Sequence, residues 1–387
     1  MKMNIECEPT QIGIGMIGCG LRLRTVLRPD PIISVNALCD IHCDSIKAAL
    51  CEYNENARIY ERYQDLVNDP MVDWVAIGSW NCEHKNHAVA ALKAGKHVFC
   101  EKPLATSLED CLSIREAVRE SGKTFSYGLV LRYSLFYRKI KEILESGAIG
   151  NIVSFEFNET IPFNHGGYIF GNWRRFQANG GTHLLEKCCH DIDLANWMTD
   201  SLPVRVASFG GLNFFRPENS DRIDQIGPDA QGREAYRAWP GLEQVNPFTS
   251  EKDIFDNQVV ILEYENGVRA SFHTNCNAGI PERRFYICGS RGALRADAVT
   301  GVIECQKIGH DSSSQRIQID VADGHAGGDR ILRESVYRSM ENGTPPLVGI
   351  DEAIESAVVC FAIDRAQSER RVVDLESLWN RVGIRFG

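Results

Sequence analysis

The segment His97-Val98-Phe99-Cys100-Glu101-Lys102-Pro103 is the stretch from which the fold can be worked out. Its apolar residues predict a strand, and Pro103 ends that strand because proline fixes its own backbone angle and disfavours helix at the preceding residue. Lys102 should therefore lie in a turn just beyond a strand end, where open α/β sheets bind ligands. A lysine in that place is either an ordinary surface residue or a group with a partner or a chemical role.

The composition is average for a soluble globular protein, and 387 residues are enough for two domains. Lysine and arginine number 42 against 52 acidic residues, so the formal charge of −10 disfavours non-specific binding to nucleic acid or anionic membranes. No run approaches the roughly 20 apolar residues of a membrane helix, and Met1–Gln11 lacks the apolar core of a signal peptide. The 14 cysteines show no CxxC or Cys/His zinc spacing. We therefore expect a cytoplasmic protein with reduced thiols and no metal site.

A glycine turn near the N-terminus predicts a dinucleotide site. Residues 12–17 read as a strand, Gly18-Cys19-Gly20 as a tight turn, and a helix should open near Leu21. Gly18 permits the turn, and Gly20 lets the backbone approach a pyrophosphate at the helix N-terminus. The third glycine of this fingerprint falls on Leu23, which leaves the close packing of helix on strand in doubt.

Asp40 strengthens the prediction of a dinucleotide site. It ends the second predicted strand, residues 34–39, and lies 20 residues after Gly20, where a carboxylate binds the ribose hydroxyls of NAD. A carboxylate there repels the 2′-phosphate of NADP, so NAD is the expected cofactor. The alternative is that Asp40 caps the helix predicted from Asp44.

Strands and helices continue to alternate along the first part of the chain. Further strands are predicted at 73–78, 96–100 and 124–130, and helices at 44–53, 87–94 and 107–121. This alternation predicts an α/β fold with a Rossmann-type parallel sheet and right-handed crossovers. We assign residues 1–128 to an NAD-binding domain.

Four features together resemble the Gfo/Idh/MocA family of oxidoreductases, which includes glucose-fructose oxidoreductase and inositol dehydrogenase. They are Gly18-Cys19-Gly20, Asp40, the turn Asn81–His84, and the segment from Ala94 to Pro103 with its Glu-Lys-Pro motif. The resemblance covers nearly the whole chain and implies a set of NAD-binding residues. This set is Gly18, Cys19, Gly20, Leu21, Arg22, Asp40, Ser79, Trp80, Asn81, His84, Glu101, Lys102, Arg132, Trp173 and Arg174.

Residues 129–387 should form an α+β domain with a large, mostly antiparallel sheet. Strand-like runs lie at 152–158, 204–215, 258–264, 268–275 and 284–289. Glu265-Asn266-Gly267 between two of these runs is a hairpin signal. Consistent with the resemblance, we expect this domain to bind substrate and to mediate assembly into a homodimer or homotetramer.

The predicted helix 183–198 carries the remaining catalytic candidates. Glu186 and His190 are four residues apart and share one face, which Asp193 continues. This polar stripe on a mostly apolar helix is either solvated or meets polar partners. The resemblance implies an acidic residue, three further residues and then the catalytic histidine, with Glu186 in place of the commoner aspartate and His190 as that histidine. Lys102, Glu186 and His190 are therefore the predicted catalytic set.

Three other features stay open between two interpretations. The pair Trp173-Arg174 resembles a Trp-Arg pair near the family's active site, and Arg132 matches a family arginine at the domain junction. Either arginine could instead be a structural ion-pair partner. The polar segment 216–253, with four prolines, is either a lid or binding loop or a disordered insertion. We expect it to cover or border the substrate site.

These features predict an NAD-dependent dehydrogenase that oxidises a secondary hydroxyl of a sugar, glycoside or cyclitol. His190 would take the hydroxyl proton, Lys102 would stabilise the developing alkoxide, and Glu186 would orient His190 or bind a neighbouring hydroxyl. Lys102 could instead be the base. An alternative is an NAD-retaining enzyme that cleaves or epimerises glycosides. Another is a non-catalytic dinucleotide-sensing regulator, which would need neither Lys102 nor His190.

Overall fold

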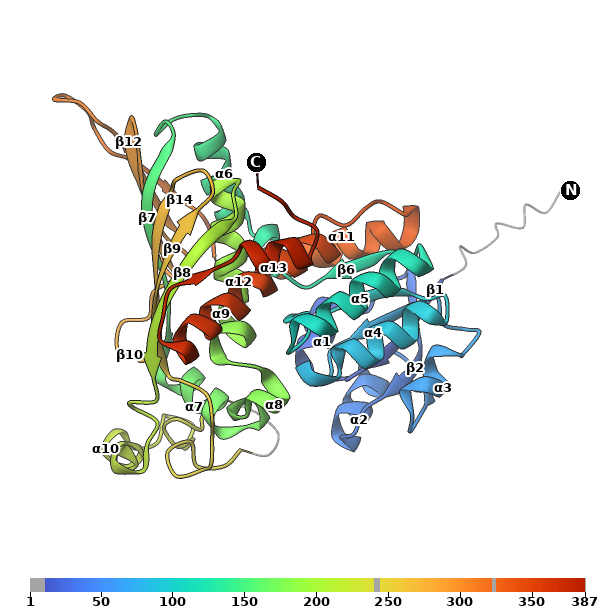
Figure 1. Ribbon diagram of the computed structural model, residues 1–387. Coiled ribbons are helices and arrows are strands. Elements are labelled where there is room, and N and C mark those ends of the chain that lie inside the picture. The colour runs from blue at the N-terminus through green and yellow to red at the C-terminus, as the bar shows by residue number, and fades with distance from the viewer. Residues whose placement is uncertain (1–10, 240–243, 322–324, 387) are drawn as a thin grey trace, which may run out of the picture.

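The computed structural model describes residues 11–239, 244–321 and 325–386. Within these residues the strands form two sheets, each covered by helices, in two lobes (Figure 1). The predicted N-terminal segment Met1–Gln11 lies almost wholly outside the described residues, as does Pro240 of the long loop.

The described strands of the first lobe form a six-stranded sheet in the order β3-β2-β1-β4-β5-β6, with every pair parallel. The strands are β1 (Ile12–Ile17), β2 (Ile33–Cys39), β3 (Arg58–Ile59), β4 (Trp74–Ile77), β5 (His97–Cys100) and β6 (Phe125–Tyr127). The order reverses between β1 and β4, which opens a crevice at the carboxyl ends of these strands. The predicted Rossmann-type sheet is confirmed.

Except for α3, which was not predicted, the helices of the first lobe begin close to the predicted positions. They are α1 (Leu21–Val26), α2 (Cys43–Glu52), α3 (Tyr63–Val67), α4 (His84–Lys93) and α5 (Leu108–Ser121), with the 3₁₀ turn η1 (Asn81–Glu83) before α4. Ser107 caps α5 by accepting a hydrogen bond from Asp110 N. Two predicted bounds were wrong. The fourth helix begins at His84 rather than His87, and β6 ends at Tyr127 because the chain then turns into the 3₁₀ helix η2 (Val130–Tyr133).

The missing third glycine is replaced by a glycine elsewhere in the fold. Leu23 is fully buried, and a Cβ placed on Gly78, just after β4, would lie only 2.9 Å from the Leu23 Cβ. The close approach of helix to sheet therefore depends on Gly78 rather than on a glycine in α1. Gly18 is required for a different reason, since its φ is +81° and an added Cβ would lie 2.3 Å from Ser79 N.

The described strands of the second lobe form a nine-stranded sheet in the order β14-β13-β12-β11-β7-β10-β9-β8-β15. All neighbours are antiparallel except β7 and β10, so the mostly antiparallel sheet is confirmed. The strands are β7 (Ile152–Pro162), β8 (Pro203–Gly211), β9 (Asn257–Tyr264), β10 (Arg269–Ala278), β11 (Arg284–Gly289), β12 (Gly292–Asp297), β13 (Val302–Lys307), β14 (Gln315–Gln318) and β15 (Val373–Asp374). The predicted strand 204–215 was too long, because β8 ends at Gly211.

Helices cover the face of the large sheet that is turned toward the first lobe, and the other face is open (Figure 1). The helices of this lobe are α6 (Leu135–Glu145), α7 (Phe163–Gly171), α8 (Gln177–Gly180), α9 (His183–Thr199), α10 (Arg222–Ile226), α12 (Ile350–Glu369) and α13 (Glu376–Arg381), with 3₁₀ turns η3 (Trp173–Arg175) and η4 (Pro217–Asn219). Helix α11 (Gly328–Asn342) instead packs on α1 and η2 beside the first lobe (Figure 1). No helix in the described parts of the chain is long and apolar enough to cross a membrane.

The end of the chain returns to the first lobe. Helix α12 packs against α9 and β8 and also against α5 and β6. Tyr127 N donates to the Val348 carbonyl at 3.2 Å, and Arg115 donates to the Val382 carbonyl at 2.7 Å. The division into residues 1–128 and 129–387 stays a prediction.

The described part of the 216–253 loop is folded, which rules out a disordered insertion there. Phe215, Tyr236 and Phe248 are buried in a small separate core beneath the loop. Its other members are Ile161, Ile169, Phe170, Ala235, Ile254 and Cys276. The loop is thereby anchored on α7 and the end of β10.

Candidate active site

A cavity of about 520 Å³ lies between the carboxyl ends of β4 and β5 and the second lobe's β7, α7 and α9. This size suits a small-molecule ligand. The predicted site residues that line it are Arg22, Ser79, Asn81, His84, Glu101, Lys102, Arg174, Glu186 and His190. The structure therefore brings together the whole predicted catalytic set at one cavity, although its members come from both lobes.

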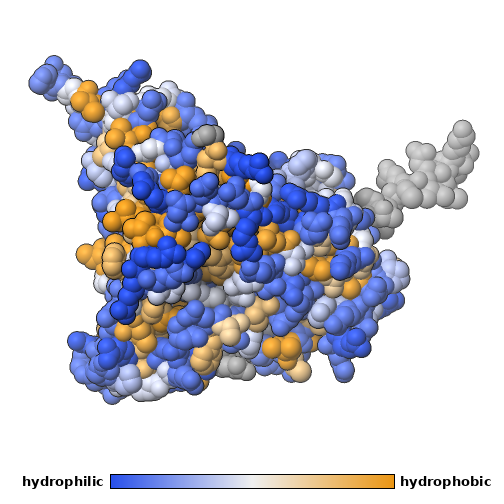
Figure 2. Space-filling model, in the orientation of Figure 1, coloured by the Kyte–Doolittle hydropathy of each residue, from blue (hydrophilic) through white to orange (hydrophobic). Residues whose placement is uncertain are grey.

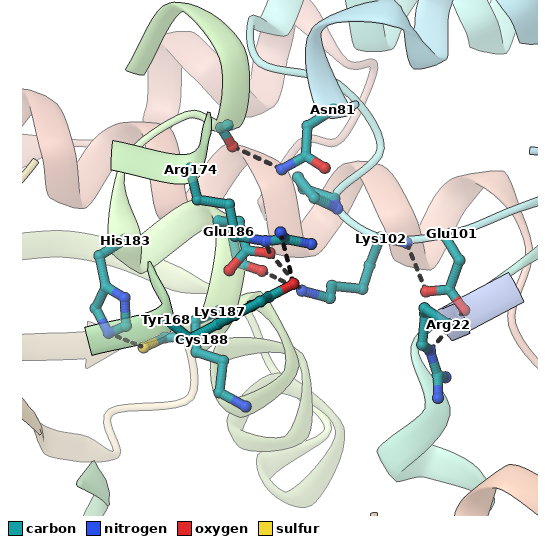
Figure 3. Close-up of polar contacts among 12 residues, drawn as sticks. Arg22, Asn81, Glu101, Lys102, Tyr168, Arg174, His183, Glu186, Lys187 and Cys188 are labelled. Carbon is teal, nitrogen blue, oxygen red and sulfur yellow. Dashed lines mark hydrogen bonds and ion pairs between the residues drawn. The ribbon is translucent and has the colours of Figure 1, made fainter. Parts of the chain in front are cut away.

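Lys102 extends from the turn after β5 to α9 of the other lobe (Figure 3). Its Nζ donates to Glu186 Oε1 at 3.2 Å and to the Glu186 backbone carbonyl at 2.5 Å. His84 stabilises this turn, since its Nδ1 lies 2.7 Å from the Pro103 carbonyl oxygen. An ammonium has three N–H donors, and the described residues accept from two of those of Lys102, which leaves one for a ligand in the cavity.

Glu186 is presented by the first turn of α9. Thr182 caps this helix by accepting a hydrogen bond from Leu185 N. Glu186 Oε1 also accepts from Arg174 Nε at 2.9 Å. Burial alone would raise the pKa of Glu186, but the charges of Lys102 and Arg174 outweigh it and hold that pKa well below its usual range. Glu186 is therefore a carboxylate at neutral pH, fixed by two cations.

His190 lies one turn further along α9 and is only 2% exposed. Burial, followed by the charges of Lys102 and Arg283, lowers the pKa of His190 well below its ordinary value. Its Nδ1 is buried and has no hydrogen-bond partner among the described residues. The imidazole is thus neutral near pH 7.

The third member of the polar stripe, Asp193, meets a polar partner rather than solvent. Arg132 donates to both carboxylate oxygens of Asp193 through Nε and Nη2 at 2.8 Å. Arg132 does not line the cavity. Of the two interpretations of this arginine, the geometry favours the structural ion pair over contact with the cofactor.

Trp80 and Trp173 stack on one another with ring centroids 5.3 Å apart, and neither lines the cavity. The Arg174 guanidinium lies 4.1 Å from the Trp173 ring centroid, and the same guanidinium donates to Glu186. The tryptophan pair therefore joins the two lobes beside the site and holds the arginine that fixes Glu186.

The glycine turn has the shape needed for a dinucleotide. Asp40 Oδ2 accepts from Cys19 N at 2.6 Å and Oδ1 from His42 N at 2.8 Å, which places its carboxylate beside the turn. The N-cap of α2 is His42, so Asp40 is not the capping residue of that helix. Gly20 is the N-cap of α1, and nothing lies within 4 Å of a Cβ added there, which leaves room for a pyrophosphate. Leu21 is exposed next to it, and these residues together fit NAD.

An ion-pair cluster behind His190 was missed by the sequence analysis. Glu159 Oε1 lies 3.2 Å from both Lys187 Nζ and Arg283 Nη1, and Arg283 also binds Asp191 with two hydrogen bonds of 2.8 and 2.7 Å. Burial would raise the pKa of Glu159, but the charges of Arg283 and Lys187 lower it. The carboxylates and Cys188 are close enough to form a metal site, yet the two cations already neutralise them. Lys187 and Asp191 flank the predicted face, but no local signal connects them to Arg283.

A second missed group joins the cofactor turn to the end of the chain. Arg22 donates to Glu101 Oε1 at 2.9 Å and to Asp329 Oδ1 at 2.6 Å. Asp329 Oδ2 also contacts His325 Nδ1 at 2.8 Å, and His325 lines the cavity. Arg22 was expected to contact NAD, and in the structure it connects α1, β5 and α11.

The fold and this site define an oxidoreductase with a nucleotide-binding lobe and a catalytic lobe. Residues 12–129 match the oxidoreductase family's NAD-binding Rossmann-fold domain, and residues 141–375 match the family's C-terminal alpha/beta domain. The chain therefore belongs to the Gfo/Idh/MocA oxidoreductase family, and the resemblance noted in the sequence is confirmed.

Known relatives agree with this family. The chain is 36% identical over 192 residues to inositol 2-dehydrogenase from Salmonella paratyphi B, covering 48% of this chain and 53% of that protein. The chain thus aligns with about half the length of such relatives. Myo-inositol 2-dehydrogenase from Lactobacillus plantarum has the same fold, with a TM-score of 0.72, 20% identity and coverage of 94% and 99% of the two chains. Levoglucosan dehydrogenase in complex with NADH and levoglucosan is similar, with a TM-score of 0.73, 17% identity and coverage of 94% and 99%.

Proposed function

We propose that this protein is an NAD-dependent dehydrogenase that oxidises a secondary hydroxyl of a sugar, glycoside or cyclitol. The observation that carries the proposal is the meeting of Lys102, Glu186 and His190 at one cavity beside the nucleotide-binding crevice. The named activities of the inositol and levoglucosan dehydrogenases support the same substrate class.

NAD would be held by the glycine turn at Gly18 and Gly20 and by Asp40, and when bound it supplies the hydride acceptor. The protein's own residues must manage the hydroxyl proton. His190, buried and neutral, is positioned to accept it. The free donor of Lys102 stabilises the negative charge that develops on the oxygen. The reverse assignment, with Lys102 as base, uses the same geometry.

Glu186 is a positioning residue in this proposal. Its carboxylate is engaged by Lys102 and Arg174, so it sets the direction of the ammonium rather than accepting the substrate proton itself.

The experiment is a screen of sugars, methyl glycosides and inositols with NAD, followed through the absorbance of reduced nicotinamide. Turnover of one or more compounds by the wild type, lost in a Lys102→Met/His190→Asn double variant, is expected. Absence of NADH formation with every compound, in a protein that binds NADH, would refute the activity and favour a sensing role.

We propose NAD rather than NADP as cofactor because the Asp40 carboxylate lies beside the turn that would hold the adenosine ribose. Asp40→Ala should reduce the preference for NAD. Comparable wild-type catalytic efficiency with NADP would contradict this assignment.

We further propose that the protein is cytoplasmic and assembles as a homodimer or homotetramer through the open face of the large sheet. Phe209, Val259 and Ile261 are 72%, 48% and 58% exposed there, and hydrophobic side chains gather on this side of the molecule (left in Figure 2). Light scattering after gel filtration should give a multiple of the 43.3 kDa chain mass, and Ile261→Lys should shift it toward the monomer. A monomeric wild type would refute the assembly.

A further inference from the structure

Trp239 is an exposed aromatic side chain at the cavity that the catalytic groups do not use. It lines the cavity with 41% of its surface exposed. Its ring stacks on His165 with centroids 4.2 Å apart and an interplanar angle of 22°, and Tyr168 lies 5.9 Å away. A large exposed indole at the wall of a ligand cavity needs an explanation, because such groups are usually buried or bind something.

The backbone around Trp239 is held in place rather than loose. Tyr236 has a left-handed backbone (φ +64°) although it is not glycine, and it is 3% exposed. Its N–H donates to Asn164 Oδ1 at 2.7 Å. A Cβ added to Gly167 would lie 1.9 Å from the Tyr236 carbonyl oxygen, so the loop lies directly against α7. A strained backbone conformation persists only when neighbouring residues hold it in place. Here the contacts of Tyr236 with α7 hold the segment that leads to Trp239.

The aromatic group is connected to the catalytic residues through a single arginine. Tyr168 OH accepts a hydrogen bond from Arg174 Nη1 at 3.1 Å, and Arg174 Nε donates to Glu186 Oε1 at 2.9 Å. The wall formed by Trp239, His165 and Tyr168 therefore continues from the groups that would bind the reacting ring. It lines the same cavity as Lys102 and His190.

We propose that Trp239, with His165 and Tyr168, forms a second sugar-ring subsite, so that the substrate is a glycoside of at least two rings. The inference rests on the proposed function. His165 covers one face of the indole, and a sugar ring can lay its apolar C–H face against indole surface left exposed. A lone cyclitol needs only the polar groups around Lys102 and His190, whereas a second ring would extend to this wall.

The test compares a disaccharide with its own monosaccharide, using cellobiose and maltose against glucose. Wild type should prefer at least one of the disaccharides, in kcat/KM and in binding to the NADH complex by calorimetry. Trp239→Ala should reduce the disaccharide-to-monosaccharide preference about tenfold, the effect of losing one stacking contact. Trp239→Phe should restore most of it, and Phe255→Ala, an exposed aromatic outside the cavity, should leave the preference unchanged.

Gly167→Ala provides an independent variant, because it displaces the loop while keeping the indole. It should reduce the same preference. Equal effects of Trp239→Ala on both sugars, or a wild type that prefers glucose, would overturn the second subsite while leaving the dehydrogenase intact. If no sugar reduces NAD, the calorimetric preference for a disaccharide still tests the subsite separately from the proposed activity.

Discussion

Replacing Lys102 by methionine tests the catalytic assignment most directly. The Nζ–Oε1 distance of 3.2 Å to Glu186 corresponds to about 5 kcal/mol of Coulomb attraction at an effective dielectric constant of about 20. Most of that energy is offset by desolvation, and Glu186 retains Arg174 at 2.9 Å. The loss in folding free energy should therefore be modest, about 1.5–3 kcal/mol, the range for a hydrogen bond to a charged group.

The catalytic loss should be larger and separate from the loss in stability. Removing one preorganised donor to a developing oxyanion costs about 100- to 1,000-fold in kcat, so Lys102→Met should retain at most about one hundredth of the wild-type kcat. The affinity for NAD should change little, because Gly18, Gly20 and Asp40 lie elsewhere on the first lobe.

The assay combines steady-state kinetics on the best sugar substrate with NADH titration and thermal unfolding. Lys141→Met is the matched control, since Lys141 is also a buried lysine that pairs with a carboxylate, Asp200, at 2.6 Å, but outside the cavity. It should lower stability without lowering kcat. Turnover by Lys102→Met within threefold of wild type would refute the catalytic assignment.

Three further predictions concern the cofactor turn, the helix packing and the pH dependence of stability. Gly20→Ala should weaken NADH binding at least about tenfold without lowering the Tm, with Gly279→Ala, equally open, as the control; retained affinity would contradict the pyrophosphate site. Gly78→Ala should lower the Tm by several degrees, because the added Cβ would meet Leu23. An unchanged Tm would contradict the claim that Gly78 permits the close approach of α1 to the sheet. Burial lowers the pKa of His183 to about 4, so below pH 6.5 the unfolded chain binds more protons and stability falls by about 3 kcal/mol on reaching pH 4. In denaturant unfolding, the stability of His183→Gln should fall less steeply over this pH range than that of the wild type. An equally steep fall would contradict the contribution assigned to His183.

Local patterns in the sequence predicted much of this structure. The turn at Gly18, the spacing to Asp40 and the shared face of Glu186 and His190 all depend on neighbours within about 20 residues, where backbone geometry fixes distances. Both lobes and both sheet types followed from the order of such segments.

Contacts between distant segments could not be predicted in the same way. Arg283 reaches Asp191 across 92 residues, and nothing in either local sequence specifies the pairing. Arg132 and Asp193 were each noticed, but not as partners. The place of Trp239 at the cavity could not be predicted either, because it depends on how its loop packs on α7.

Because the C-terminal segment packs on α5 and β6, the first half of the chain does not form all of its contacts on its own. A fragment that stopped at residue 128 would expose the surfaces of α5 and β6 that α12 covers, and Tyr127 N would lose its acceptor on Val348. The nucleotide-binding half is contiguous in sequence, yet it is completed only after the ribosome has made the last part of the chain. A truncated product would therefore carry unfinished core surface on α5 and β6, and such surface promotes aggregation.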